Sequence, residues 1–156
     1  MLHLLRLKTP ALAVAAPAVM VTAALAGGFW ISAYSPAAPV AANIRDAVVV
    51  IAAEGCANPS DAKLNGTAEG LVRGQRQSVA LQFTPTSKPG VYAVKKQWPA
   101  EGAWVLSITG DYRGHNSTVL VELEPNGKFR AEPARAGVKA ADRVEAALRA
   151  MAARTS

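Results

Sequence analysis

The sequence predicts an antiparallel β-sandwich, and the spacing of its apolar residues is the main reason. From Asp46 onward, apolar and polar side chains alternate along several short segments, which gives each segment one apolar face. Turn-forming residues separate these segments at intervals of roughly 10–15 residues, and no interval accommodates a helix of about ten residues. Two sheets that close over a shared core fit this pattern, whereas a parallel α/β fold does not.

Six or seven strands are expected in this part of the chain. They are 47–53, 64–72, 79–83, 92–98, 104–109, 118–124 and, as the seventh, 128–131. The alternation is clearest in the third, fifth and sixth of these, and Arg73-Gly74-Gln75-Arg76 has the composition of a tight hairpin. Seven apolar residues on the predicted inner faces are expected to form the core: Leu81, Phe83, Trp104, Leu106, Ile108, Val119 and Val121.

A short amphipathic helix is predicted near the end of the chain. Apolar side chains recur at steps of three and four residues after Gly137, over about 16 residues. The residues of this apolar stripe are Val138, Ala141, Val144, Leu148 and Met151. Because a helix of this length is marginal by itself in water, we expect it to pack on the sandwich or to fray, with contact to a partner as the alternative.

The chain begins with a segment that has the layout of a bacterial-type export signal. Arg6 and Lys8 precede an apolar run at 11–26, and small residues follow the run. The same segment fits an uncleaved membrane anchor, because the 24 uncharged residues at 11–34 are long enough to cross a hydrocarbon core of about 30 Å. Both alternatives place everything after residue 42 outside the cytoplasm.

The two alternatives differ in the role of the residues that follow the apolar run. A cleaved signal needs a small-x-small site, and both Ala24-Leu25-Ala26 and Val40-Ala41-Ala42 qualify. A retained anchor instead uses Phe29, Trp30 and Tyr34 as an aromatic belt at the far membrane interface. The sequence leaves both alternatives open.

These observations divide the chain into four parts. The parts are a signal peptide or membrane anchor at 1–34, a linker at 35–45, the β-sandwich domain at 46–131, and a basic tail with the short helix at 132–156. Cleavage at the second small-x-small site would leave a mature chain that begins at Asn43, close to the start of the predicted domain.

The net charge of +6 does not indicate nucleic-acid binding, because the excess lies outside the predicted domain. Residues 45–126 carry eight basic and eight acidic side chains, while 1–42 have a net charge of +2 and 127–156 one of +4. A nucleic-acid module would concentrate positive charge and aromatic residues on the folded surface. We expect the basic side chains of the tail to form a solvated face, with weak attraction to anionic lipid as the alternative.

A hairpin motif in the predicted domain resembles a pattern found in small exported Ig-like domains. Pro89-Gly90-Val91-Tyr92 is followed by Trp98-Pro99-Ala100-Glu101-Gly102-Ala103-Trp104-Val105-Leu106, which is similar to the "G-x-Y … P-x-x-G-x-W-x-L" hairpin of the FixH and YtkA-like kind. The resemblance covers roughly 46–124 and implies an Ig-like sandwich outside the cytoplasm. Since some relatives are linked to copper or to cytochrome oxidase assembly, it also implies a metal-delivery or oxidase-assembly accessory role as an alternative function.

Few side chains of the predicted domain suit catalysis or metal binding. Cys56, His115 and Met151 are the soft or imidazole ligands that remain after residue 42, with no second histidine among them. A thiolate nucleophile at Cys56 with His115 as its base is the enzymatic alternative, but no third residue that would orient the base is identifiable. We therefore expect no catalytic, cofactor-binding or metal-ligating residue.

The connection at 110–116 is the candidate partner-binding loop, because recognition commonly occurs on exposed loops of a rigid scaffold. Its candidate residues are Tyr112, Arg113 and His115. Taken together, the sequence predicts a non-catalytic exported module, periplasmic or anchored in the inner membrane. We expect this module to act through contacts with a protein partner that the sequence does not identify.

Overall fold

The structure, a computed structural model, describes residues 28–38, 44, 46–123, 129–133 and 139–155. Its strands are β1 (Trp30–Tyr34), β2 (Ala47–Glu54), β3 (Lys63–Val72), β4 (Gln75–Ala80), β5 (Thr84–Pro85), β6 (Val91–Lys95), β7 (Ala103–Tyr112), β8 (His115–Leu123) and β9 (Phe129–Pro133). Its helices are the short 3-10 helix η2 (Pro59–Asp61) and α1 (Ala140–Thr155). The pairing of these strands into two antiparallel sheets confirms the architecture that the sequence predicts.

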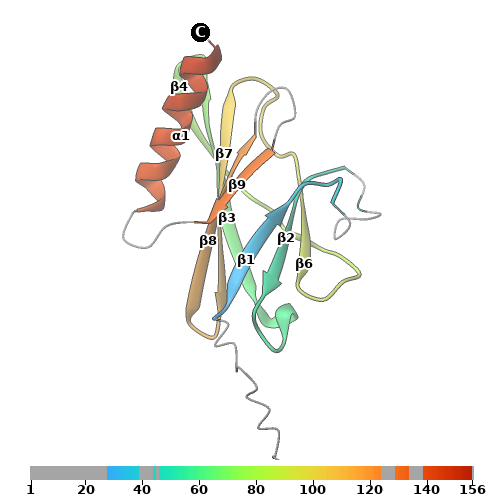
Figure 1. The fold of residues 1–156 in the computed structure, drawn as a ribbon. Helices are drawn as coiled ribbons and strands as arrows, with labels where there is room; N and C mark the ends of the chain where they lie inside the picture. The colour runs from blue at the N-terminus through green and yellow to red at the C-terminus, as the bar shows by residue number, and fades with distance from the viewer. Residues whose placement is uncertain (1–27, 39–43, 45, 124–128, 134–138, 156) are drawn as a thin grey trace, which may run out of the picture.

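The strands form two antiparallel sheets that face each other (Figure 1). The four-stranded sheet has the order β1-β2-β6-β5, and the five-stranded sheet has the order β4-β3-β7-β8-β9. Long hairpins build the second sheet, since β3 pairs with β4 and β7 pairs with β8 directly after a tight turn. The chain crosses between the sheets after β2, β4 and β6.

The core lies between the two sheets and contains every residue expected there. Leu81, Trp104, Leu106, Ile108, Val119 and Val121 are buried, and Phe83 packs against them while remaining partly exposed. The four-stranded sheet adds Ile31, Val49, Ile51 and Val94, which are not among the core residues expected from the sequence. This core therefore draws on alternate residues of both sheets, as the period of two requires.

Two-residue turns close both long hairpins of the five-stranded sheet. Arg73 and Gly74 have φ of 50° and 77°, and Arg113 and Gly114 have φ of 54° and 85°. Positive φ at both central residues matches the twist of the flanking strands, and glycine reaches it without steric cost. The hairpin predicted at Arg73-Gly74 is confirmed, whereas the connection predicted at 110–116 is mostly strand, with Arg113-Gly114 as its turn.

Two predicted strands begin and end at other residues than expected. β4 ends at Ala80, so that Leu81 and Phe83 of the predicted 79–83 strand follow it as irregular chain while still reaching the core. β6 ends at Lys95, and Trp98 is buried outside any strand. Apolar side chains at alternating positions can thus enter the core from irregular backbone, which an alternation pattern does not distinguish from a strand.

The first strand of the sandwich comes from residues that the sequence analysis assigns to the leader. Trp30–Tyr34 form β1 and pair with β2 over five residue pairs, from Trp30 opposite Glu54 to Tyr34 opposite Val50. Ile31 is 4% exposed in the core, and its backbone N–H donates to Ser117 Oγ at 3.1 Å. The sandwich therefore begins at Trp30 instead of Asp46, and 35–45 connect β1 to β2 instead of linking a leader to the domain.

The C-terminal helix packs on the outer face of the five-stranded sheet, as expected from its apolar stripe (Figure 1). Val144, Leu148 and Met151 are each at most 3% exposed, and they contact Val105 and Leu120 of the sheet. Three ion pairs flank this contact, namely Arg76–Glu145 at 2.9 Å, Arg143–Glu132 at 3.0 Å and Arg154–Glu122 at 3.5 Å. Val105 lies between Trp104 and Leu106 on the face of β7 turned away from the core, and it is fully buried because α1 covers it.

The predicted signal or anchor segment lies almost entirely in 1–27, outside the described residues. Within the ranges that the structure describes, no helix is both long and apolar enough to cross a bilayer.

Candidate recognition surface

The candidate partner-binding residues at the β7–β8 hairpin have different environments. Tyr112 is buried and stacks on Phe29, with ring centroids 5.7 Å apart. Arg113 is exposed, and its guanidinium carbon lies 5.2 Å from the centroid of the Tyr112 ring. His115 is exposed opposite Tyr112 at the start of β8. Tyr112 is thus a supporting residue of the sheet, and only Arg113 and His115 are presented to solvent.

Among the described residues, no hydrogen bond joins Cys56 to His115. Cys56 is half-buried and packs against the small cluster of Ala53, Ala62 and Tyr112, whereas His115 is exposed at the hairpin. Across the described ranges, no three His, Cys, Asp or Glu side chains gather closely enough to hold a metal ion.

A convergent set of polar contacts lies instead between β1 and the end of β2. Glu54 Oε2 accepts a hydrogen bond from Trp30 Nε1 at 2.8 Å and another from the Ser32 hydroxyl, and Oε1 accepts one from the Tyr34 hydroxyl at 2.8 Å. We refer to these four residues, Trp30, Ser32, Tyr34 and Glu54, as the Glu54 cluster. Its three donors all come from one strand.

The alternation of side chains along β1 explains why three of its residues donate to Glu54. Successive side chains of a strand point to opposite faces, so Trp30, Ser32 and Tyr34 share the face turned away from the core. Ile31 and Ala33 point the other way and pack in the core. Since Glu54 lies directly opposite Trp30 in the register, its carboxylate can extend along β1 and accept from all three donors.

The indole of Trp30 is exposed but held in place. It is 44% exposed, and among the described residues it is the one large hydrophobic side chain with that degree of exposure. The ring packs directly on Gly55, where a Cβ atom would lie 2.3 Å from Cζ3, and its N–H is fixed by Glu54. A rigid, exposed tryptophan loses little conformational entropy on binding, and such residues are enriched at the centres of protein interfaces.

The protonation of the cluster follows from the same contacts. Burial alone would raise the pKa of Glu54, but the hydrogen bonds from Ser32, Tyr34 and Trp30 outweigh it and lower the pKa below its usual value. The pKa of Tyr34 is raised, first because its hydrogen bond to Glu54 favours the protonated phenol and second because of burial. At neutral pH the cluster is therefore an anion with neutral donors, which suits a fixed structural role better than proton transfer.

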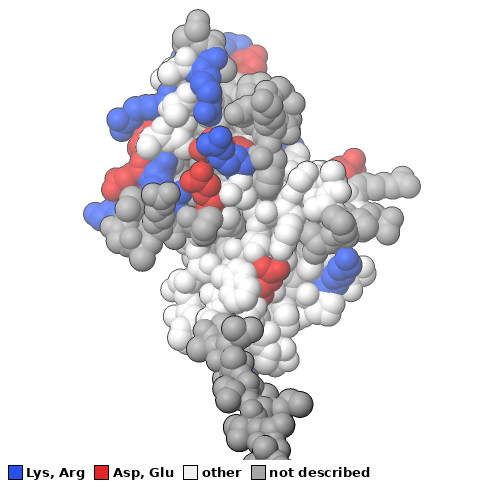
Figure 2. Space-filling model, viewed as in Figure 1, with Lys and Arg blue, Asp and Glu red and all other residues white. Residues whose placement is uncertain are grey.

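The surface around the cluster is mostly uncharged. Figure 2 shows few charged side chains over β1 and the lower part of the sandwich, whereas Lys, Arg, Asp and Glu gather around α1. On the same outer face, Val50, Ala52 and Val91 form a small apolar cluster against which Tyr34 packs. Trp30 thus projects from a face of low charge, at the end of the sandwich where the chain enters β1.

A concave feature lies between α1 and the five-stranded sheet. It is a groove of about 260 Å³ lined by Leu120, Glu122, Arg130, Glu132, Arg143, Ala146, Ala147 and Ala150. Its charged rim is partly engaged in the ion pair between Arg143 and Glu132. The groove is a seam between packed elements, and it brings together no catalytic constellation.

The Glu54 cluster is absent from the sequence analysis because its donors lie in the segment assigned to the leader. The segment from Trp30 to Tyr34 carries no distinguishing signal, because its uncharged composition fits the end of a leader as well as a strand. The role of Glu54 has no local signature, since its partners lie 20 to 24 residues away in the chain.

Comparison of the chain with protein-family models, with curated proteins and with solved structures gives no match. The geometry of the described residues is therefore the basis for a functional proposal.

Replacing Glu54 with glutamine is expected to lower the free energy of unfolding by about 1–2 kcal/mol at neutral pH, because a neutral amide accepts weaker hydrogen bonds than a carboxylate. The loss is limited to this range because the site is partly exposed to solvent. The folded-state pKa of Glu54 lies below its unfolded value. Its contribution is therefore present above the unfolded pKa and is lost as the pH falls through the folded pKa. Urea unfolding between about pH 7 and pH 3 should show the two proteins converge in stability in acid.

Glu101→Gln is the matched control for this measurement. Glu101 pairs with Arg73 on the surface, where both side chains are more than half exposed, so its loss should cost below about 1 kcal/mol. An effect of Glu54→Gln no larger than that of Glu101→Gln would contradict a stabilising role for the cluster.

Proposed function

We propose that this chain is an exported, non-catalytic Ig-like β-sandwich module, periplasmic or held at the inner membrane, that acts through protein–protein contacts. The basic and apolar start of the sequence supports export. The motif that resembles FixH and YtkA-like domains contributes Trp98 and Trp104, whose rings lie 6.2 Å apart in the core, and this supports the Ig-like assignment.

The observation that carries the proposal is the fixed, exposed indole of Trp30. Tryptophan is enriched among the residues that dominate binding at protein interfaces, and the indole of Trp30 is held for such contact by the hydrogen bond to Glu54 and by packing on Gly55. The low charge of the surrounding face favours a partner that offers an apolar pocket for the indole.

Site-specific photo-cross-linking in the cells that produce the protein tests this proposal. A photoreactive benzophenone amino acid in place of Trp30 is expected to give a covalent adduct of defined mass with one partner protein. The same amino acid in place of Arg149, which is exposed on α1 away from this face, should give none.

Two results would contradict the assignment of the surface. Adducts formed equally from positions 30 and 149 would show unspecific collision, and adducts formed at Arg113 but not at Trp30 would move recognition to the β7–β8 hairpin. Unchanged far-ultraviolet circular dichroism of each variant excludes unfolding as the cause, which is expected because all three side chains are exposed.

A further inference from the structure

The position of β1 bears on how the leader is processed. We infer that the leader is removed by hydrolysis of the peptide bond between Ala26 and Gly27, so that the exported protein begins at Gly27 and keeps β1. This inference rests on the proposed export of the chain. It selects one of two small-x-small sites and favours a cleaved signal over a retained anchor.

Cleavage after Ala42 would remove a strand that the core needs. Ile31 of β1 is 4% exposed and fills the space left by Gly110 of β7, where a Cβ atom would lie 2.6 Å from Ile31 Cγ2. The backbone N–H of Ile31 also joins the two sheets through Ser117. A chain that begins at Asn43 would have a gap at this position and an uncovered β2.

The loss would extend to the outer face. Glu54 takes all three of its side-chain hydrogen bonds from β1, so removal of that strand leaves the carboxylate without Trp30, Ser32 and Tyr34. It would also leave β2 as an edge with unpaired backbone groups, which is a template for aggregation. The second small-x-small site is therefore incompatible with the folded sandwich.

The same strand shortens the segment available as a membrane anchor. Phe29 stacks on Tyr112 and Tyr34 donates to Glu54, so neither is available for an aromatic belt. Without Phe29 and 30–34, the uncharged residues left from Ala11 onward are 11–28, which span about 27 Å as a helix against the roughly 30 Å of a hydrocarbon core. The apolar part of this stretch is 11–26, and half of its residues are alanine. That length is close to the apolar region of a cleaved signal.

The local sequence suits the cut. Ala24 and Ala26 place small side chains at the two positions that a leader peptidase requires. Water adds across the amide, the C–N bond breaks, and Ala26 leaves as a carboxylate while Gly27 keeps a free amine. Gly28 is exposed, and a Cβ atom there would meet no other atom within 4 Å, so the new terminus lies next to an exposed residue that precedes β1.

Expression of the full chain in a bacterial host, followed by fractionation and intact-mass measurement, tests the inference. The exported fraction is expected to have the mass of a chain that begins at Gly27. Ala26→Tyr should abolish this form and accumulate the precursor, while the control Ala42→Tyr should leave processing unchanged.

Each other outcome overturns the inference in a distinguishable way. An exported chain that begins at Asn43, or a full-length chain held in the membrane with its sandwich accessible from outside, refutes the cut after Ala26 but leaves the proposed export intact. An uncut chain recovered from the cytosol refutes export and, with it, this processing.

Discussion

Replacing Trp104 with alanine is expected to lower the free energy of unfolding by about 3–5 kcal/mol. Trp104 is 3% exposed between the two sheets, and its ring packs on Gly70 of β3, where a Cβ atom would lie 2.5 Å from Cε3. Because Gly70 has no side chain that can move into the space, the cavity would persist. The loss should therefore fall toward the upper end of the range.

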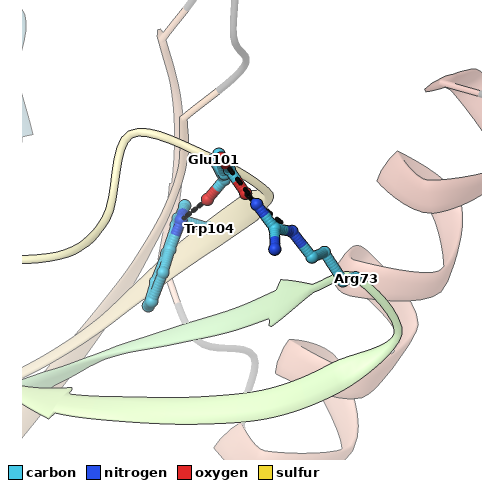
Figure 3. A network of polar contacts seen from close by, with 3 residues as sticks. All are labelled: Arg73, Glu101 and Trp104. Atoms are coloured by element: carbon cyan, nitrogen blue, oxygen red, sulfur yellow. Dashed lines mark hydrogen bonds and ion pairs between the residues drawn. The ribbon is translucent and has the colours of Figure 1, made fainter.

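The packing of the Trp104 ring and the hydrogen bond of its N–H can be tested by different substitutions. Its Nε1 donates to the carbonyl of Glu101 at 2.8 Å, and the Glu101 carboxylate pairs with Arg73 from the neighbouring hairpin (Figure 3). Trp104→Phe keeps a large aromatic ring but loses the donor and part of the buried ring, so it should cost less than Trp104→Ala. Arg73→Ala breaks an exposed pair and should cost below about 1 kcal/mol.

Urea unfolding followed by circular dichroism measures all three variants. The expected order of destabilisation is Trp104→Ala, then Trp104→Phe, then Arg73→Ala. If Trp104→Ala costs no more than Arg73→Ala, the ring is not central to the core.

The fold was largely predictable because the core imposes its pattern locally. In β7, Trp104, Leu106 and Ile108 face the core between two sheets, and such positions require apolar side chains at every second residue. The Arg73-Gly74 turn was equally visible, since a two-residue hairpin needs a backbone conformation that favours glycine. Both features depend on neighbours in the sequence.

The first strand was not predictable by the same means. Trp30 to Tyr34 follow an uncharged run, and that composition fits the end of a leader as well as it fits a strand. Two contacts hold these residues as strand β1. One is the backbone pairing with β2, and the other is the carboxylate of Glu54, which accepts hydrogen bonds from the side chains of Trp30, Ser32 and Tyr34. These contacts join residues about twenty positions apart, so no local window contains them.

The candidate site shows the same limit. Tyr112 belongs to a polar, glycine-containing segment, which predicts an exposed loop. The two-residue turn at Arg113-Gly114 instead extends the strands, and stacking on Phe29 buries the ring of Tyr112. The partner that decides its exposure lies more than eighty residues earlier in the chain.

Leu148→Ala is expected to lower the free energy of unfolding by about 2–4 kcal/mol. Leu148 is 2% exposed and packs with Val144 and Met151 against the sheet, where Val105 is fully buried and Leu120 is 4% exposed. The side chain lies in the middle of α1, so the cavity is flanked by the helix on one side and by β7 and β8 on the other. Arg149→Ala, at the neighbouring exposed position, should change stability by less than about 0.5 kcal/mol.

Urea unfolding combined with amide hydrogen exchange decides whether the helix unfolds with the sandwich. A shared loss of protection in α1 and in β7 would show one cooperative unit, because Val105 and Leu120 depend on the helix for their burial. Equal effects of Leu148→Ala and Arg149→Ala would instead show that the helix contributes little. The apolar contact should dominate over the flanking ion pairs, since these pairs are only partly buried, are screened by salt and each contribute about 1 kcal/mol or less. Added salt should therefore leave most of the Leu148 effect in place, which would exclude the charged face of α1 as the main source of its attachment.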